Sequence, residues 1–287
     1  MRKTLLIIAI LCLLLAGCRT QPAESQIVAT TMPVYTICRE LCQGTDLSVT
    51  QLIQDDVSCL HNYTLQVGQM QLLERSEVVV TNGAGLEDFL EDALSSVKRK
   101  IDASQGIDLY CKDEFDHEDH HHDNDPHIWL SPVLASQMAD NICRELSGFY
   151  PEHSSIFENN LTELNNKLAR LLSYGQEQLS TLSTRNMITF HDGFHYFAQC
   201  FDLNIVAAIE EESGSETSAA NLIKLIQIMK EYDLPAVFTE VNSSTASANI
   251  VASETGVKTY TLDMSVSQGD YFEIMYRNID TVKEALG

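Results

Sequence analysis

The sequence predicts an α/β protein with two lobes of parallel sheet flanked by helices and joined by one long rigid helix. Three observations lead to this prediction. Short apolar segments alternate with amphipathic helical segments across residues 27–150, which is the pattern of parallel βα units. The alternation returns across residues 185–287. Between the two, residues 151–184 carry an apolar stripe at helical spacing and no strand signal.

The chain begins with a targeting signal. Arg2 and Lys3 precede an apolar run over residues 5–15 that is too short to cross a bilayer comfortably. The following Leu-Ala-Gly-Cys resembles a bacterial lipoprotein signal, which implies removal of residues 1–17 and a lipid anchor on Cys18. Residues 18–26 then form a polar tether. An ordinary signal peptide or an uncleaved anchor is the alternative; the lipoprotein interpretation places the protein on the extracytoplasmic face of a bacterial cell membrane.

The N-terminal lobe, residues 27–150, is expected to contain three strands and four helices. The strands are predicted at 27–31, 48–53 and 77–81, and the helices at 32–41, in the ten residues after Thr64, from 86 onward, and at 132–146. Ser131 followed by Pro132 is typical of an N-cap with proline at the first helical position.

The linker prediction depends on one apolar stripe. At three- and four-residue spacing the stretch 154–182 contains Phe157, Leu161, Leu164, Leu168, Leu171, Leu179 and Leu182. A helix of this length would extend roughly 45 Å, which suits a strut between lobes, and Gly175 should weaken it locally. A coiled-coil partner is the alternative, but the stripe is short and lies between two βα regions.

The C-terminal lobe, residues 185–287, repeats the alternation of the first. Strands are predicted at 187–190, 205–209, 235–239 and 258–262, and helices at 219–232, 243–255 and 271 to the end. Gly256 should stop the middle helix in the C′ position.

Composition narrows the class of partner. The 287 residues include 18 basic and 41 acidic side chains, for a net charge of −23, so nucleic acid is excluded and a cation is favoured. Of eight cysteines none forms a C-x-x-C pair, which argues against a zinc ribbon. Cys38 and Cys42 should share a helix face. Disulfides would be permitted outside the cell, and buried free thiols are the alternative.

An acidic, histidine-rich stretch stands out at residues 113–132. Its first part, 113–125, has no apolar period and carries His117, His120, His121 and His122. We interpret it as a mobile loop that attracts metal, and a charged loop without a metal role is the alternative. His127 differs, because apolar residues and a helix start follow it directly. It is therefore a candidate fixed ligand.

Further candidate ligands follow predicted strands. His61 comes shortly after one strand of the first lobe, and His191 and Asp263 end strands of the second. Ligands of open α/β sheets bind at the carboxyl ends of the strands, so facing lobes would bring these three side chains to His127. Three imidazoles and one carboxylate complete a tetrahedral zinc shell. His195, four residues after His191, could replace it on a shared helix face, and Glu240 could support the site or supply an oxygen.

The chain resembles the metal-binding lipoproteins of bacterial ABC importers for zinc and manganese (cluster A-I), and among them the zinc-type members. The resemblance runs from residues 31–35 to 269–271 and is carried by residues 125–132 (DPHIWLSP), 191–197 (HDGFHYF), 261–263 (TLD), 82–87 (NGAGLE) and 212–216 (ESGSE). It implies a metal held between two lobes by His61, His127, His191 and Asp263.

Zinc is favoured by two features that the resemblance brings out. The acidic histidine-rich loop belongs to the zinc-type members, and His191 stands where manganese-type relatives often carry Glu. This sequence departs from the family at two places. Cys59 and Leu60 precede His61 where an acidic residue and proline are usual, which admits Cys59 as a further metal contact. His195 stands where a small residue is usual.

The resulting functional hypothesis is a monomeric zinc receptor, not an enzyme, that hands Zn²⁺ to an ABC permease driven by a cytoplasmic ATPase. Histidines bind zinc when neutral, so affinity should fall as the pH drops through about 6.5. A zinc enzyme is disfavoured, because four protein ligands leave no open position for water. The remaining alternatives are a manganese receptor of the same family and a surface lipoprotein for cell adhesion.

Overall fold

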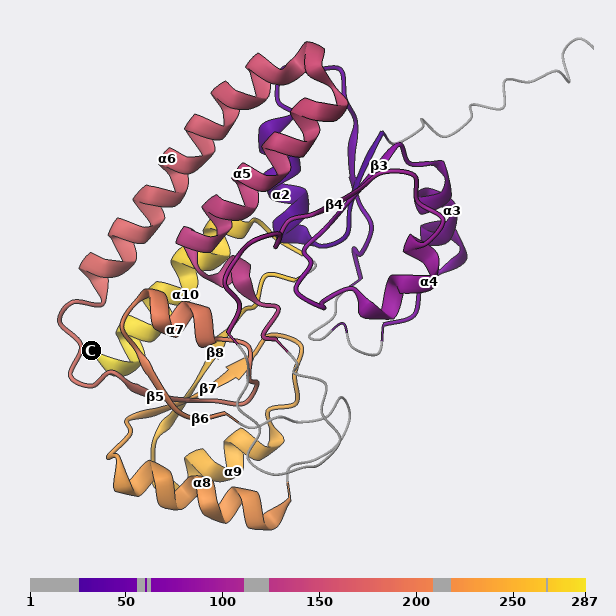
Figure 1. Cartoon of the computed structure of the whole chain (residues 1–287). Helices are drawn as coiled ribbons and strands as arrows, with labels where there is room; N and C mark the ends of the chain where they lie inside the picture. The colour runs from indigo at the N-terminus through magenta and orange to yellow at the C-terminus, as the bar shows by residue number, and fades with distance from the viewer. Residues whose placement is uncertain (1–25, 56–59, 61–62, 111–123, 209–217, 267) are drawn as a thin grey trace, which may run out of the picture.

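The structure is a computed structural model that describes residues 26–55, 60, 63–110, 124–208, 218–266 and 268–287. The predicted signal peptide, the Cys18 anchor and most of the tether lie outside the described residues. The described part consists of two sheet-containing lobes with a long helix beside them (Figure 1). No helix among these residues has the length and apolar character that a membrane crossing requires.

The N-terminal lobe is built on a four-stranded parallel sheet with strand order β2-β1-β3-β4. Its strands are β1 (Ile27–Ala29), β2 (Val49–Gln51), β3 (Val78–Thr81) and β4 (Lys100–Asp102). Its helices are α2 (Met32–Leu41), α3 (Val67–Arg75), α4 (Glu91–Leu94) and α5 (Pro132–Phe149), with short 3-10 turns η1 (Asp88–Leu90) and η2 (Ile128–Leu130). The central strands β1 and β3 are wholly buried, as their continuous apolar sequences require.

Two local features of this lobe differ in how well the sequence predicts them. The start of α5 is confirmed, because the Ser131 hydroxyl accepts a hydrogen bond from the Leu134 N–H and Pro132 opens the helix. Strand β4 is not among the predicted strands. It has three residues, and only its middle residue, Ile101, is buried, so it lacks the apolar run that marks the other strands.

The linker is the 25-residue helix α6 (Ser154–Gln178), preceded by η3 (Pro151–His153). At 1.5 Å per residue it extends about 37 Å. The predicted end at Leu182 is wrong: the helix closes at Leu179, whose N–H bonds back to the Gly175 and Glu177 carbonyls. Gly175 has a packing role, because a Cβ there would lie 2.2 Å from the Phe201 ring. Glycine thus lets α6 approach the C-terminal lobe closely.

The C-terminal lobe has a second four-stranded parallel sheet, with order β6-β5-β7-β8. Its strands are β5 (Asn186–Thr189), β6 (Asn204–Ala208), β7 (Ala236–Glu240) and β8 (Lys258–Leu262). Its helices are α7 (His195–Cys200), α8 (Ala219–Glu231), α9 (Ala246–Thr255) and α10 (Tyr271–Leu286). Gly256 caps α9 with a φ of 75°, as predicted. Helix α7 is too short to show a periodic stripe and is missing from the predicted elements.

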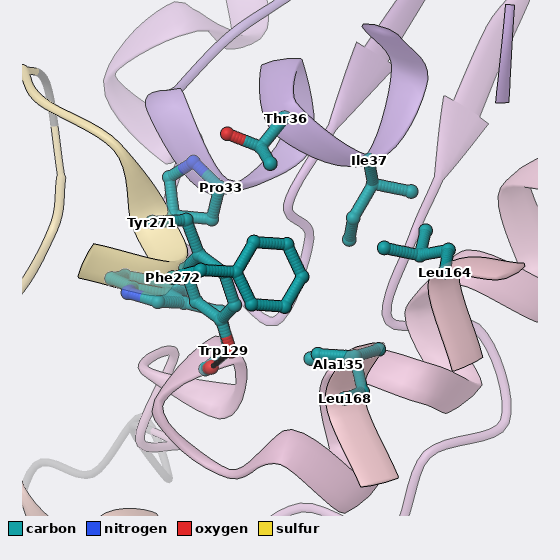
Figure 2. Close-up of a pocket in the computed structure, with 9 residues that line it drawn as sticks. All are labelled: Pro33, Thr36, Ile37, Trp129, Ala135, Leu164, Leu168, Tyr271 and Phe272. Carbon is teal, nitrogen blue, oxygen red and sulfur yellow. Dashed lines mark hydrogen bonds between the residues drawn. The ribbon is translucent and has the colours of Figure 1, made fainter. Parts of the chain in front are cut away.

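A single hydrophobic cluster runs through both lobes. It joins strands of both sheets with α2, α5, α6 and α10, while a smaller cluster fills the space between β7, α8 and α9. Figure 2 shows a pocket at the helix junction, lined by Pro33, Thr36, Ile37, Trp129, Ala135, Leu164, Leu168, Tyr271 and Phe272. Its walls are almost entirely apolar, so this pocket is a packing feature and cannot hold a metal ion.

The cysteines that the structure describes are free thiols: Cys38, Cys42, Cys143 and Cys200. Cys38 lies on α2 and Cys42 caps the C-terminal end of that helix, one turn further along, and both are buried. Burial raises the pKa of the Cys42 thiol to about 12, so at neutral pH it stays protonated and unreactive. Cys59 and Cys111 lie outside the described residues.

Candidate metal centre

The C-terminal sheet brings three polar side chains to one edge. Glu240 is the last residue of β7, Asp263 directly follows β8, and His191 follows β5 by two residues. Strands β5, β7 and β8 are neighbours and all parallel, so their carboxyl ends meet at the same edge. The fold thus places His191 and Asp263 at one sheet edge, as the sequence predicts.

His127 comes from the N-terminal lobe and is held by one carboxylate. Its Nδ1 lies 2.7 Å from Asp125 Oδ1, and its backbone N–H donates to the same oxygen at 3.0 Å. The side chains of both residues are almost fully buried. An ionised carboxylate only accepts hydrogen bonds, so it fixes the proton on Nδ1 and leaves Nε2 as the lone-pair nitrogen. That is the form of imidazole that a metal binds.

His191 lies against His127 from the other lobe. The two ring centroids are 5.5 Å apart and the rings are nearly perpendicular, at 88°. The Nδ1 of His191 lies 3.7 Å from Oε1 of the buried Glu240, which is too long for a hydrogen bond but close enough for a charge to act. Each imidazole therefore has a buried carboxylate beside its Nδ1.

Gly193 is needed for the two rings to meet. A Cβ at this position would lie 2.6 Å from Met264 Sδ, 2.9 Å from His191 Cδ2 and 3.0 Å from His127 Cε1. Any side chain would displace a histidine ring or Met264, the residue after Asp263. The sequence contains no local signal for this role, because two of the three neighbours, His127 and Met264, are distant from Gly193 along the chain.

Asp263 has its own set of partners. Its Oδ2 forms an ion pair with Arg277 of α10 at 3.0 Å, and its Oδ1 accepts a hydrogen bond from the Ser265 N–H at 2.8 Å. Within the described residues no three His, Cys, Asp or Glu side chains are gathered closely enough to hold a metal. The structure therefore brings together two of the predicted ligands, His127 and His191, and turns the Asp263 carboxylate toward Arg277.

The remaining predicted metal-binding residues lie outside the described residues. They are the fourth predicted ligand His61, its neighbour Cys59, and the loop histidines His117, His120, His121 and His122. The ends of the loop are described: the Asp125 N–H donates to the Tyr110 carbonyl at 3.0 Å. The chain thus leaves and re-enters the described structure at adjacent points, two residues from His127.

Hydrogen bonds between the lobes lie next to the candidate ligands. The Trp129 indole N–H donates to the Met264 carbonyl at 2.7 Å, which ties a neighbour of His127 to a neighbour of Asp263. The Tyr196 hydroxyl donates to the Asp125 carbonyl at 3.1 Å and accepts from the Tyr110 N–H at 2.9 Å. The placement of one lobe on the other is therefore coupled directly to the position of the ligands.

The loop after β3 holds the segment that contains His127. The Asn82 amide donates to the Pro126 carbonyl at 3.0 Å. The fully buried Glu87 carboxylate accepts from the Thr30 hydroxyl and from the backbone N–H groups of Asn82 and Gly83. Burial outweighs these hydrogen bonds and raises the pKa of Glu87 to about 7. In the sequence, only the family resemblance marks this loop.

His195 does not share a helix face with His191, the arrangement considered from the sequence. Helix α7 begins at His195, so His191 precedes the helix and the two do not share a helix face. The His195 ring stacks on Tyr110, with centroids 3.5 Å apart and planes 15° apart. Burial lowers the pKa of its imidazole. The structure gives it a packing role at the base of the histidine-rich loop.

Comparison with known proteins identifies a family that matches this sequence. The sequence matches the model of the family described as zinc-uptake complex component A, periplasmic (ZnuA), over residues 27–285. The zinc-binding lipoprotein AdcA of Streptococcus pneumoniae serotype 4 is 31% identical over 99% of this chain, which spans only 61% of the AdcA length. The high-affinity zinc uptake system protein ZnuA of Bacillus subtilis is 28% identical over 98% of this chain and 97% of its own length.

The fold agrees with solved structures as well. A crystal structure of ZnuA aligns with a TM-score of 0.82 at 27% identity, and the alignment covers 91% of this chain and 98% of the other. The agreement extends over both lobes and the long helix between them, which confirms the two-lobed α/β architecture expected from the sequence.

Proposed function

We infer that this chain, which belongs to the ZnuA family of zinc-uptake components, is an extracytoplasmic receptor that captures Zn²⁺ between its lobes and delivers it to an ABC permease. The observation that carries this proposal is the meeting of His127 and His191, from different lobes, at a centroid distance of 5.5 Å. The family consists of transport components rather than enzymes, and we propose no catalytic role.

The proposed zinc shell consists of His61, His127, His191 and Asp263. Imidazole nitrogens with one carboxylate oxygen suit zinc better than manganese, which prefers a shell dominated by oxygen. Asp125 holds the His127 ring in the tautomer that leaves Nε2 for the metal, and Glu240 would polarise His191 in the same sense. Four protein ligands would close the shell to water, which suits cargo held for transfer.

Release would begin with separation of the lobes. The bonds from Trp129 to Met264 and from Tyr196 to Asp125 cross between the lobes within two residues of a candidate ligand. A permease that pulls the lobes apart would break these bonds and draw His127 away from His191 and Asp263. The permease and its cytoplasmic ATPase are thus the proposed partners, and the receptor is proposed to act as a monomer.

The outer segments have proposed roles of their own. Cys18 would carry the lipid that anchors the receptor to the membrane, and Cys18→Ala should move the protein from the membrane fraction to the soluble fraction. The loop histidines would raise the local concentration of zinc beside the site. Deleting residues 113–123 should then slow zinc association while leaving the affinity of the main site within about threefold.

Competition titration against a zinc chelator tests the proposal. We expect one tight site with a dissociation constant in the nanomolar range or below, and much weaker binding of Mn²⁺. Zinc binding no tighter than micromolar would rule out the receptor. Tight binding of manganese instead would assign the chain to the manganese receptors, and His191→Glu in the zinc receptor should shift preference toward manganese.

A growth experiment separates transport from adhesion. A deletion strain should fail to grow in zinc-depleted medium and should recover when zinc, but not manganese, is added. Normal growth of the deletion strain, together with reduced attachment to surfaces, would instead support an adhesion lipoprotein.

A further inference from the structure

Arg277 forms an ion pair with Asp263, a candidate zinc ligand. Its guanidinium Nη2 is 3.0 Å from Asp263 Oδ2, and its side chain is 59% exposed against 20% for Asp263. An ordinary surface ion pair at this exposure has little effect on stability. Here the position matters more than the strength, because the carboxylate that would bind the cation already has a cationic partner.

Asp263 is positioned by groups other than Arg277. The Asn278 side chain holds its backbone from both sides, accepting from the Asp263 N–H at 3.0 Å and donating to the Asp263 carbonyl at 2.7 Å. The Ser265 N–H holds Oδ1 at 2.8 Å. Without Arg277 the carboxylate would therefore stay in place but lose its neutralising charge.

The charge balance of the chain makes this arginine unusual. With 18 basic and 41 acidic residues, most acidic side chains have no basic partner available. A fixed positive charge within a few ångströms of a bound dication repels it, and by Coulomb's law the repulsion at such a distance corresponds to roughly a tenfold loss of affinity even in water. A site selected only for tight binding would not keep such a charge.

We propose that Arg277 is a built-in competitor of zinc for Asp263. Zinc must displace or share the guanidinium to bind the carboxylate, and the guanidinium takes the carboxylate back when the lobes separate. Arg277 thus lowers the affinity and speeds release to the permease. This inference rests on the proposed function, since it assumes that zinc binds at Asp263.

The test compares Arg277→Gln with the wild type and with a matched control. Arg144→Gln removes the same charge from a side chain of nearly the same exposure, 58%, that pairs with Glu145 on α5 instead of with a candidate ligand. Zinc affinity is measured by competition with a chelator, and dissociation by stopped-flow mixing with excess chelator. We expect Arg277→Gln to bind zinc roughly tenfold more tightly and to release it correspondingly more slowly, and Arg144→Gln to match the wild type.

Two further measurements separate charge from positioning. Arg277→Lys keeps the positive charge and should stay within about threefold of wild-type affinity. The gain in Arg277→Gln should shrink as salt rises from low to molar concentration, because added ions screen the repulsion. Weaker or unchanged zinc binding in Arg277→Gln overturns the proposal, since either result would make Arg277 a support of Asp263 or a bystander.

The outcome also distinguishes this inference from the proposed function. If the wild type binds no zinc, the receptor proposal fails and the competitor role fails with it. If the wild type binds zinc and Arg277→Gln, folded by far-UV circular dichroism, does not bind it more tightly, only the role of Arg277 fails.

Discussion

The two halves of the candidate centre hold their side chains in different ways. In the N-terminal half, His127 is 5% exposed and its ring is fixed by a 2.7 Å contact with Asp125, two residues away. In the C-terminal half, His191 lies 3.7 Å from Glu240, and Asp263 is shared with the exposed Arg277. The first half is set by short hydrogen bonds within one loop, the second by charges that a cation can rearrange. We infer that the first half fixes the site and the second half tunes it.

Removing the fixed imidazole should have the largest effect. His127→Ala is expected to weaken zinc binding by more than about 100-fold, because a structural zinc site gains several kcal/mol from each of its four ligands. His153→Ala is the matched control, since His153 pairs with Asp46 at 2.9 Å on the N-terminal lobe and is not a candidate ligand. Competition titration gives both affinities; equal values for the two variants would exclude His127 as a ligand.

Removing a supporting carboxylate should cost more zinc affinity the closer that carboxylate lies to its histidine. Asp125→Asn should cost about 10–100-fold in zinc affinity, the usual effect of removing a carboxylate behind a ligating histidine. Glu240→Gln should cost less than about tenfold, because its 3.7 Å separation from His191 is beyond hydrogen-bond length. An equal or larger loss in Glu240→Gln would reverse the assignment of the fixed and the tuned half.

The bond that crosses between the halves can be broken without touching a ligand. Trp129→Phe removes the donor to the Met264 carbonyl and part of a fully buried ring, and should lower the free energy of unfolding by about 2–4 kcal/mol. Urea unfolding followed by far-UV circular dichroism measures it, with Tyr232→Phe at an exposed site as control. A Trp129→Phe protein as stable as the wild type would mean that this bond does not hold the lobes together.

The last expected effect concerns the pH dependence of stability and comes from Glu87, behind the fixed half. Its pKa is raised from an ordinary value near 4.5 to about 7, so the folded state binds a proton that the unfolded state has lost. Its contribution to stability is therefore complete below pH 4.5 and is lost as the pH rises to about 7. Relative to Glu87→Gln, the wild type should lose about 3 kcal/mol of unfolding free energy across this range, at ~1.4 kcal/mol per pKa unit.

Urea unfolding at several pH values measures the Glu87 effect. Glu254→Gln, which changes an exposed glutamate on α9, should show no such difference from the wild type. If the difference in unfolding free energy between the wild type and Glu87→Gln did not change with pH, the raised pKa of the buried Glu87 carboxyl would be contradicted.

The fold could be predicted where a local pattern repeats. The apolar runs of β1 and β3, the Ser131–Pro132 helix start and the stripe of α6 are all local, and each is confirmed. Strand β4 is absent from the prediction because only its middle residue is apolar, and helix α7 is absent because six residues are too few to show a helical period. The end of α6 was placed too late because leucines continue at helical spacing beyond the last helical residue.

The site was predictable only in part, for a different physical reason. His191 and Asp263 could be placed because strand ends are local features, and the sheet aligns them. The role of Gly193 and the ion pair of Arg277 with Asp263 depend on contacts between residues distant in sequence or on separate elements. Neither leaves a periodic or compositional trace. The complete ligand set, which the strand ends and the family resemblance both indicate, stays a prediction.

The most direct test of the central claim is a crystal structure of the zinc-loaded protein with anomalous data collected on both sides of the zinc absorption edge. The account predicts one strong anomalous peak about 2.0–2.2 Å from Nε2 of His127 and from side-chain atoms of His61, His191 and Asp263. A peak that lacks both His127 and His191 among its ligands, or zinc bound only by the loop histidines, would contradict it.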